Sequence, residues 1–453
     1  MKRFPASAPC QLIVAVTLSA FSAPGLASEG TLHVGWAAVE ITPPREVALV
    51  GQMHPRIAGR ARDPLTATVL ALETKRDGRS LEQAVMISCD LGYIRQVTEE
   101  GLRRSAAREL KDLDPEKVFL HATHTHTAPG QVDGTFSVWW GDEPPAVAMS
   151  STEYGQWLVD RLSDGLAKAW QSRKPAGMSW GLGQAVVGHN RRAVYRSGES
   201  VMYGDTSRGD FIGIEGFEDP GVPMLFFWND REELTGVVIN LATPSQETEG
   251  LSEVSADFWH EVRQEVRKRH QPGWFIFPQC AASGDISPHL MFRKRAEQIM
   301  LERKGVSSRQ EIALRIADAL DAVLPYAEAG LKKKLPLRHK ILHLDLPRAS
   351  PSREPPYPID GGGRFRVHVI RLGDVALVSV PFELYLEYSI RIQARSPAVL
   401  TFTVQLASQL AGYLPTTEAV AGGGYSADQF LVGPEGGDVL VEEVLKAIHS
   451  LFR

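Results

Sequence analysis

The chain has 453 residues, of which 43% are hydrophobic and 23% are charged. This composition is ordinary for a globular protein and is enough for about two to four domains or one large α/β domain. The formal net charge of −5 gives no electrostatic basis for a nucleic-acid-binding protein or for attraction to an anionic membrane surface.

The first 28 residues have the pattern of a secretory signal peptide. Lys2 and Arg3 precede the apolar stretch Leu12–Ala23, and small residues around Ala27 offer a cleavage site. This stretch is too short to span a bilayer comfortably, and no later segment reaches the ~18 consecutive apolar residues of a membrane helix. We therefore expect residues 1–28 to be a signal peptide and the mature protein to be soluble and secreted or periplasmic.

Strand-like and helix-like patterns alternate along the rest of the chain. Short apolar runs predict strands within residues 32–44, 63–74, 84–92, 118–126, 223–245, 274–281, 364–383 and 399–408. Apolar residues at helical spacing predict helices over residues 98–111, 152–171, 256–269 with Ser255 as the N-cap, 308–323, from 384 onward, and 439–451. Residues 131–150 indicate a loop, and residues 326–365 indicate an irregular linker. The alternation predicts an α/β fold in which mixed β-sheets are packed with helices.

Three histidines lie close together in the segment VFLHATHTHTAPG. His124 and His126 are two residues apart at a predicted strand end, where such residues point to the same side. Two imidazoles on one side can share a cation, or one can bind metal while the other moves a proton. The alternative is a pair of structural histidines near the surface. His121, within the strand, is as consistent with a structural residue as with a functional one.

The segment AASGDISPH brings together side chains of nucleophile, acid and base types. These are Ser283, Asp285, Ser287 and His289. Gly284 allows a tight turn whose backbone N–H groups can face an oxyanion. The alternative is an Asp/Ser turn whose side chains only cap the backbone.

Further along the chain, Glu383 ends an apolar strand and opens a helix. A carboxylate there can bind metal, act as a base, or simply complement the helix dipole. Tyr413 and Tyr425 lie in a polar, glycine-rich segment, where exposed tyrosines need no functional explanation. Residues 177–181 match G-x-S-x-G, but they lack the preceding strand and following helix of a nucleophile elbow, so we reject that motif.

Taken together, these segments resemble the catalytic N-terminal domain of the neutral, non-lysosomal ceramidase family. The family motifs T-H-T-H-S-G-P-G, N-R-S, G-D-x-S-P and P-G-E, and two tyrosines twelve positions apart, have counterparts in the same order. The counterparts are Thr123–Gly130, Asn190–Arg192, Gly284–Pro288, Pro381–Glu383, and Tyr413 with Tyr425. The resemblance covers almost the whole mature chain and implies that residues 29–453 form a single large ceramidase-like catalytic domain.

The resemblance also implies a role for each matched residue. These are His124, Glu383 and Tyr413 as zinc ligands, His126, Arg191 and Tyr425 as polar groups around the scissile amide, and Ser287 as the nucleophile. The implied reaction is the hydrolysis of ceramide or a related N-acyl lipid amide, with Zn²⁺ as the cofactor that polarises the carbonyl. The protein would contact a membrane only through such a substrate.

The chain departs from the family at three places. The family carries a second zinc-ligand histidine in an N-F-A-x-H segment, where this chain has Pro244. Three protein ligands remain, which a catalytic zinc site accepts, and Gln246, Glu247 or Glu249 is a possible substitute for the fourth. The family's immunoglobulin-like C-terminal domain has no counterpart here. The long loop around Trp139 and Trp140 either lines an apolar substrate groove or packs on the body.

Two other interpretations remain open at this point. The first is a non-catalytic lipid- or glycan-binding protein on the same scaffold, in which Pro244 marks the loss of full zinc coordination. The second is a metal-dependent amidohydrolase barrel, which also uses His-x-His after a strand. In that fold the pair normally follows the first strand, whereas several predicted strands precede it here.

Overall fold

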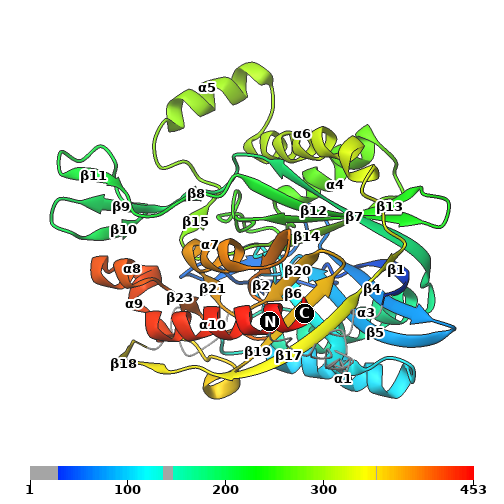
Figure 1. The fold of residues 1–453 in the computed structure, drawn as a ribbon. Coiled ribbons are helices and arrows are strands. Elements are labelled where there is room, and N and C mark those ends of the chain that lie inside the picture. Colours follow the sequence, from blue (N-terminus) through cyan, green and yellow to red (C-terminus); the bar gives the residue numbers. More distant parts are fainter. Residues whose placement is uncertain (1–28, 136–145, 354) are drawn as a thin grey trace, which may run out of the picture.

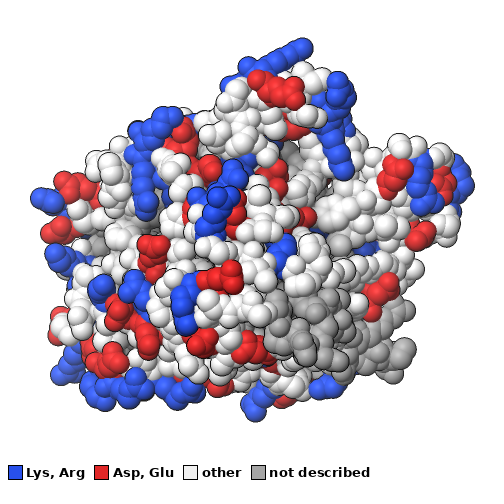
Figure 2. Space-filling model, turned by 180° about the vertical axis from the view of Figure 1, so that it is seen from behind, with Lys and Arg blue, Asp and Glu red and all other residues white. Residues whose placement is uncertain are grey.

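The sheets and helices form four layers, seen from the edge in Figure 1. This computed structural model describes residues 29–135, 146–353 and 355–453. The predicted signal peptide and the Trp139-Trp140 loop lie outside these residues. Within the described part, no helix is long and apolar enough to cross a membrane. On the face in Figure 2, basic and acidic side chains are intermingled, in keeping with the small net charge.

A large mixed sheet forms the first of the two central layers. Its strands run in the order β14-β13-β12-β7-β1-β4-β5-β6, with β16 paired to β1. They are β1 (Gly30–Glu40), β4 (Thr66–Arg76), β5 (Arg79–Cys89), β6 (Val118–Ala122), β7 (Lys174–Gln184), β12 (Gly221–Asn229), β13 (Leu234–Leu241), β14 (Phe275–Cys280) and β16 (Lys334–Leu335). Only the β5–β6 and β13–β14 pairs are parallel among these strands. The sheet is therefore open and mainly antiparallel, which excludes the amidohydrolase barrel.

A second sheet packs against one face of the first. It has the order β17-β19-β20-β22. Its strands are β17 (Leu337–Asp345), β19 (Arg364–Leu372), β20 (Val375–Ser379) and β22 (Leu400–Val404). Buried side chains from both sheets, such as Phe119, Phe277 and Phe402, form the core between them. This sheet-on-sheet core separates the two outer layers of helices.

Helices cover the outer faces of both sheets. They are α1 (Gln96–Glu109), α3 (Ser151–Gln171), α4 (Phe258–Arg269), α5 (Lys294–Lys304), α6 (Ser308–Glu328), α7 (Leu386–Arg395), α8 (Thr417–Gly422), α9 (Tyr425–Asp428) and α10 (Pro434–Leu451). The first two and α4 with α6 cover the large sheet, whereas α7 and α10 cover the small one. α5 has no buried residue and stands out at the top of Figure 1.

Side-chain alternation explains why the large sheet is buried on both faces. In β1, Ala37 and Val39 pack under the helices, whereas Leu32 and Val34 face the second sheet. Because each face needs apolar side chains, the central strands read as nearly continuous apolar runs, as residues 84–89 do. The sequence pattern and the layer arrangement therefore agree, and the α/β prediction is confirmed.

Two helix starts follow directly from their local sequence. Ser150 and Glu153 form a capping box on α3, and Ser307 forms one on α6 with Gln310. The predicted N-cap Ser255 is wrong, because Asp257 caps α4 by accepting a hydrogen bond from the N–H of Phe258. Ser255 instead uses its hydroxyl within a buried network described below.

The predicted linker over residues 326–365 is also wrong. This region contains β16, β17 and β18 (Arg348–Arg353). β17 forms the edge of the small sheet, and its basic residues hide the strand pattern, because edge strands commonly carry Lys and Arg. Two short 3-10 helices lie at Pro115–Lys117 and Gly361–Gly363.

Short strand pairs connect the layers around one region. They are β2 (Val47–Leu49) with β3 (Arg56–Ala58), β8 (His189–Asn190) with β15 (Ile286–Ser287), β21 (Glu383–Leu384) with β23 (Tyr413–Leu414), β18 with β24 (Phe430–Val432), and the sheet of β9 (Arg192–Tyr195), β10 (Ser200–Met202) and β11 (Phe211–Ile214). Most of the predicted site residues lie on these short pairs or directly after them.

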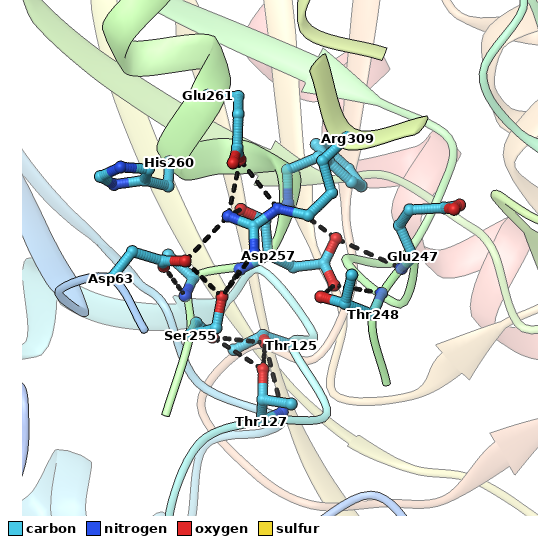
Figure 3. A network of polar contacts seen from close by, with 12 residues as sticks. Asp63, Thr125, Thr127, Glu247, Thr248, Ser255, Asp257, His260, Glu261 and Arg309 are labelled. Atoms are coloured by element: carbon cyan, nitrogen blue, oxygen red, sulfur yellow. Dashed lines mark hydrogen bonds and ion pairs between the residues drawn. The ribbon is translucent and has the colours of Figure 1, made fainter. Parts of the chain in front are cut away.

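A buried arginine joins four distant segments beneath this region (Figure 3). Arg309, at the start of α6, is 2% exposed. Its guanidinium donates to Asp63 at 2.8 Å, to the Ser255 hydroxyl at 3.0 Å and to Glu261 at 2.6 Å. Ser255 in turn accepts hydrogen bonds on its carbonyl from the hydroxyls of Thr125 and Thr127, both at 2.9 Å. The network therefore ties the segment with the histidines to the protein body.

We expect Arg309→Met to lower the free energy of unfolding by about 3–5 kcal/mol, because it leaves the carboxylate of Asp63 buried without its cation. Urea unfolding followed by circular dichroism measures this change. Arg208→Met is the control, because its ion pair with Asp210 is exposed on the surface and should leave the unfolding midpoint unchanged. Equal effects of the two substitutions would contradict a structural role for the network.

Candidate active site

The two neighbouring histidines lie on a loop rather than on a strand. β6 ends at Ala122, and His124 has a left-handed backbone with φ 64°. The imidazoles of His124 and His126 share a side, as the spacing predicts, with ring centroids 4.9 Å apart. Thr125 and Thr127 alternate with them and point the other way, toward Ser255. The two threonines therefore fix the direction in which the two histidines point.

His124 meets Glu383 inside the protein. Its Nδ1–H donates to the carbonyl oxygen of Gly92, and its Nε2 lies 3.2 Å from Oε2 of Glu383. Burial alone would raise the pKa of Glu383, but His124 and Arg191 hold it below its ordinary value. The carboxyl group is therefore an anion facing the imidazole.

Tyr413 completes this cluster. β21 and β23 are parallel and place Glu383 opposite Tyr413, and the two side chains are hydrogen-bonded. Because Nδ1 of His124 carries the proton that Gly92 accepts, Nε2 presents a lone pair to a carboxylate oxygen. Two such acceptors repel each other unless a proton or a metal cation lies between them. The donor chemistry of His124, Glu383 and Tyr413 therefore fits a cation.

Pro244 contributes no side-chain donor, and its possible substitutes have other partners. Nε2 of Gln246 donates to Nε2 of His126 at 2.7 Å, and Oε2 of Glu249 lies 3.3 Å from Nδ1 of the same ring. Glu247 faces His289. Within the described residues, no group of three or more His, Cys, Asp or Glu side chains could hold a metal. A third protein ligand at this site would thus be the phenolic oxygen of Tyr413.

Arg191 and Ser287 lie at the other side of the cluster. The Arg191 guanidinium donates to the Gly284 carbonyl at 2.9 Å and to the hydroxyls of Tyr203 and Tyr413, both at 3.4 Å. The Ser287 hydroxyl oxygen accepts hydrogen bonds from the Tyr203 hydroxyl at 3.0 Å and from the His289 N–H at 3.1 Å. A fixed cation and a buried hydroxyl are therefore linked through Tyr203.

The other polar residues of the SGDISPH turn have structural contacts. The Ser283 hydroxyl contacts Cys280 and Gln405. Asp285 accepts hydrogen bonds from the Asn190 amide at 2.8 Å and from the backbone N–H of Leu386 at 2.9 Å. Burial raises the pKa of Asp285 to about 6 despite these donors. Asp285 thus holds the turn against β8 and the start of α7.

These groups surround a cavity of about 350 Å³. Six of the seven predicted site residues line it, namely His124, His126, Arg191, Glu383, Tyr413 and Tyr425. Ser287 contacts its wall through Tyr203. Apolar side chains complete the lining, namely Val50, Met53, Met202, Leu406 and Leu410. The structure therefore brings together residues that are up to 301 positions apart, from His124 to Tyr425.

Sequence reasoning missed Tyr203. It follows β10 in a left-handed conformation, and nothing in the surrounding letters VMYGD signals that its hydroxyl reaches Ser287. Glu249 was considered only as a possible zinc ligand, whereas it contacts His126. A pattern of sequence neighbours cannot reveal either contact, because both join segments about 84 and 123 positions apart.

Two residues set aside on sequence grounds are indeed structural. Ser179 of the G-x-S-x-G match lies within β7 and accepts a hydrogen bond from the indole of Trp228 at 2.9 Å. His121 lies inside β6, packed edge-on against Phe277. Burial lowers the pKa of His121 to about 3, so it is a neutral core residue.

Comparison with known proteins places this geometry in context. No protein-family model matches the chain. A neutral ceramidase of Pseudomonas aeruginosa is 25% identical over 236 residues, which is 51% of this chain and 33% of that protein. The chain thus spans about a third of the length of this curated relative.

Solved structures match much more of the chain. The crystal structure of neutral ceramidase from Pseudomonas aeruginosa covers 94% of this chain and 75% of its own, with a TM-score of 0.73 and 18% identity. A ceramidase complexed with C2 covers 93% of this chain and 75% of its own, with a TM-score of 0.68 and 17% identity. Together with the partial sequence match, these likenesses identify a neutral ceramidase-like domain in this chain.

Proposed function

We propose that the chain is a zinc-dependent hydrolase that cleaves the amide bond of ceramide or of a related N-acyl lipid amide. The observation that carries this proposal is the meeting of six motif residues in one partly apolar cavity, with Ser287 at its wall. The partial match to a neutral ceramidase supports the same reaction class. An acyl chain suits the apolar part of the cavity, and the charged cluster suits a polarised amide.

His124, Glu383 and Tyr413 are the proposed zinc ligands. The hydrogen bond from Nδ1 of His124 to the Gly92 carbonyl supports this, since metal-binding histidines usually donate their other ring N–H to such a partner. When bound, zinc would polarise the amide carbonyl and lower the pKa of a coordinated water. Three protein ligands match a catalytic zinc site with an open position.

The remaining residues would act directly on the amide. Ser287 is the proposed nucleophile, and Arg191 and Tyr425 would stabilise the negative charge that develops on the carbonyl oxygen. His126 would contact the amide from the opposite side of the cluster. Overall, one water is consumed, the C–N bond breaks, and a carboxylic acid and an amine are released.

Other parts of the proposal rest on the sequence. We propose that residues 29–453 act as one catalytic domain and that residues 1–28 direct the protein to a secreted or periplasmic location. The described surface, with its intermingled charges, agrees with a small-molecule substrate rather than a nucleic acid. Contact with a membrane would occur only where a lipid substrate is taken up.

We expect Ser287→Ala to lower kcat for a fluorogenic N-acyl amide by about 10³-fold or more, as removal of a nucleophile does. Ser283→Ala is the matched control from the same turn. Its hydroxyl contacts Cys280 and Gln405 and not Tyr203, so this variant should keep most of its activity. Full turnover by the Ser287 variant, with unchanged circular dichroism, would refute the assignment.

We expect His124→Ala to lose both bound zinc and amide hydrolysis while the fold is retained. Equilibrium dialysis followed by elemental analysis gives the zinc content, and assays with and without a chelator give the activity. His449→Ala, on the exposed end of α10, is the control and should behave as the unaltered protein. A chain that is free of zinc, inactive on every amide and still binds lipid would support the binding-protein alternative instead.

A further inference from the structure

A second cavity of about 500 Å³ lies beside the first. Its roof is α5, and its floor is the start of α6 with residues near 187–189. Its lining is Val187, His189, Tyr203, Glu247, Glu249, Pro288, His289, Leu290, Lys294, Glu297, Gln298, Leu301, Ser308, Glu311, Ile312 and Arg315. No role in the proposed reaction has been given to most of these residues.

The two cavities share a wall at the proposed nucleophile. Tyr203 and Glu249 line both cavities. Ser287 accepts hydrogen bonds from Tyr203 on one side and from the backbone of His289 on the other, and the His289 side chain lines the second cavity. Oε1 of Glu249 lies 3.6 Å from Nε2 of His289, while its Oε2 faces His126. An amide held at Ser287 would therefore point one substituent into each cavity.

Carboxylates outnumber cations in the second cavity. They are Glu247, Glu249, Glu297 and Glu311, against Lys294 and Arg315, which gives four negative and two positive formal charges with histidine neutral. Glu311 is only 6% exposed, and its Oε2 has no hydrogen-bond partner among the described residues. A buried carboxylate oxygen without a donor is costly, and a cationic or N–H group entering the cavity would supply one.

The charged groups of the second cavity come from its roof, floor and shared wall. An alkyl chain placed there would remove these carboxylates from water without pairing them, which is unfavourable. In contrast, apolar residues such as Met53, Leu406 and Leu410 line the first cavity. The two compartments therefore select different chemistry at the two ends of a substrate.

Resting on the proposed amide hydrolysis, we propose that the second cavity binds the amine half of the substrate and prefers an amine whose far end is cationic. The acyl chain occupies the first cavity. Hydrolysis breaks the C–N bond, adds the elements of one water, and releases the acyl group as a carboxylic acid. The amine nitrogen takes up a proton and leaves as an ammonium ion at neutral pH. The natural substrate class is thus the N-acyl derivatives of polar, cationic amines rather than two-chain amides.

A panel with one acyl group and one stem length tests this preference. The substrates are lauroyl amides of pentylamine, 1,5-diaminopentane and 5-aminopentanoic acid, together with N-lauroylsphinganine. We expect kcat/KM to fall from the ammonium-ended to the methyl-ended and then to the carboxylate-ended amide, by about tenfold for each step at low salt, and the spread to narrow at high salt.

Substitutions on α5 locate the effect. Glu297→Gln should reduce the preference for the ammonium-ended over the methyl-ended amide several-fold and leave kcat/KM for the methyl-ended amide unchanged. Glu302→Gln, on the same helix but outside the cavity lining, should change neither value. α5 has no buried residue, so both variants should fold.

The outcomes separate this inference from the proposed function. Equal rates for all end groups, or a preference for N-lauroylsphinganine, would overturn the assignment of the second cavity and leave amide hydrolysis standing. A preference that survives Glu297→Gln intact would also overturn it. Failure to hydrolyse every amide in the panel, with zinc supplied, would overturn the proposed function and this inference together.

Discussion

The buried ion-pair network around Arg309 sets the geometry on which the site depends. A charged guanidinium with 2% exposure is tolerated only because carboxylates and hydroxyls satisfy it. Through Ser255, the same network fixes Thr125 and Thr127, and these residues alternate with His124 and His126. The imidazoles therefore face the cavity because their neighbours in sequence are anchored in the opposite direction. A loop gains by this means the rigidity usually supplied by a strand.

The cavity residues come from segments that share little local sequence. Each short strand pair supplies one part: β21 and β23 hold Glu383 beside Tyr413, and β8 and β15 hold the turn that carries Ser287. Their burial makes every polar group depend on its partners, since an unpaired one would be costly in a medium of low dielectric. The site is thus as much a product of the layered core as of its motifs.

Much of the architecture could be predicted from the sequence, because apolar runs and helix caps are local signals. The layers could not, since the side of a sheet on which a helix packs depends on contacts between distant strands. β17 was missed because its basic residues on a sheet edge obscure the alternation of buried positions. Among the site residues, the motifs predicted His124 and Glu383, whereas Tyr203 has no local signature and is defined only by the contact of its hydroxyl with Ser287.

The left-handed backbone of His124 bears on the history of the chain. Glycine, asparagine and aspartate adopt a φ of 64° more readily than histidine does, and such a conformation costs about 1–3 kcal/mol. If the position served only to turn the chain, random substitution would tend to replace the imidazole with one of these residues. A histidine kept at an unfavourable position, while its former partner has become Pro244, is the mark of selection acting on the ring itself.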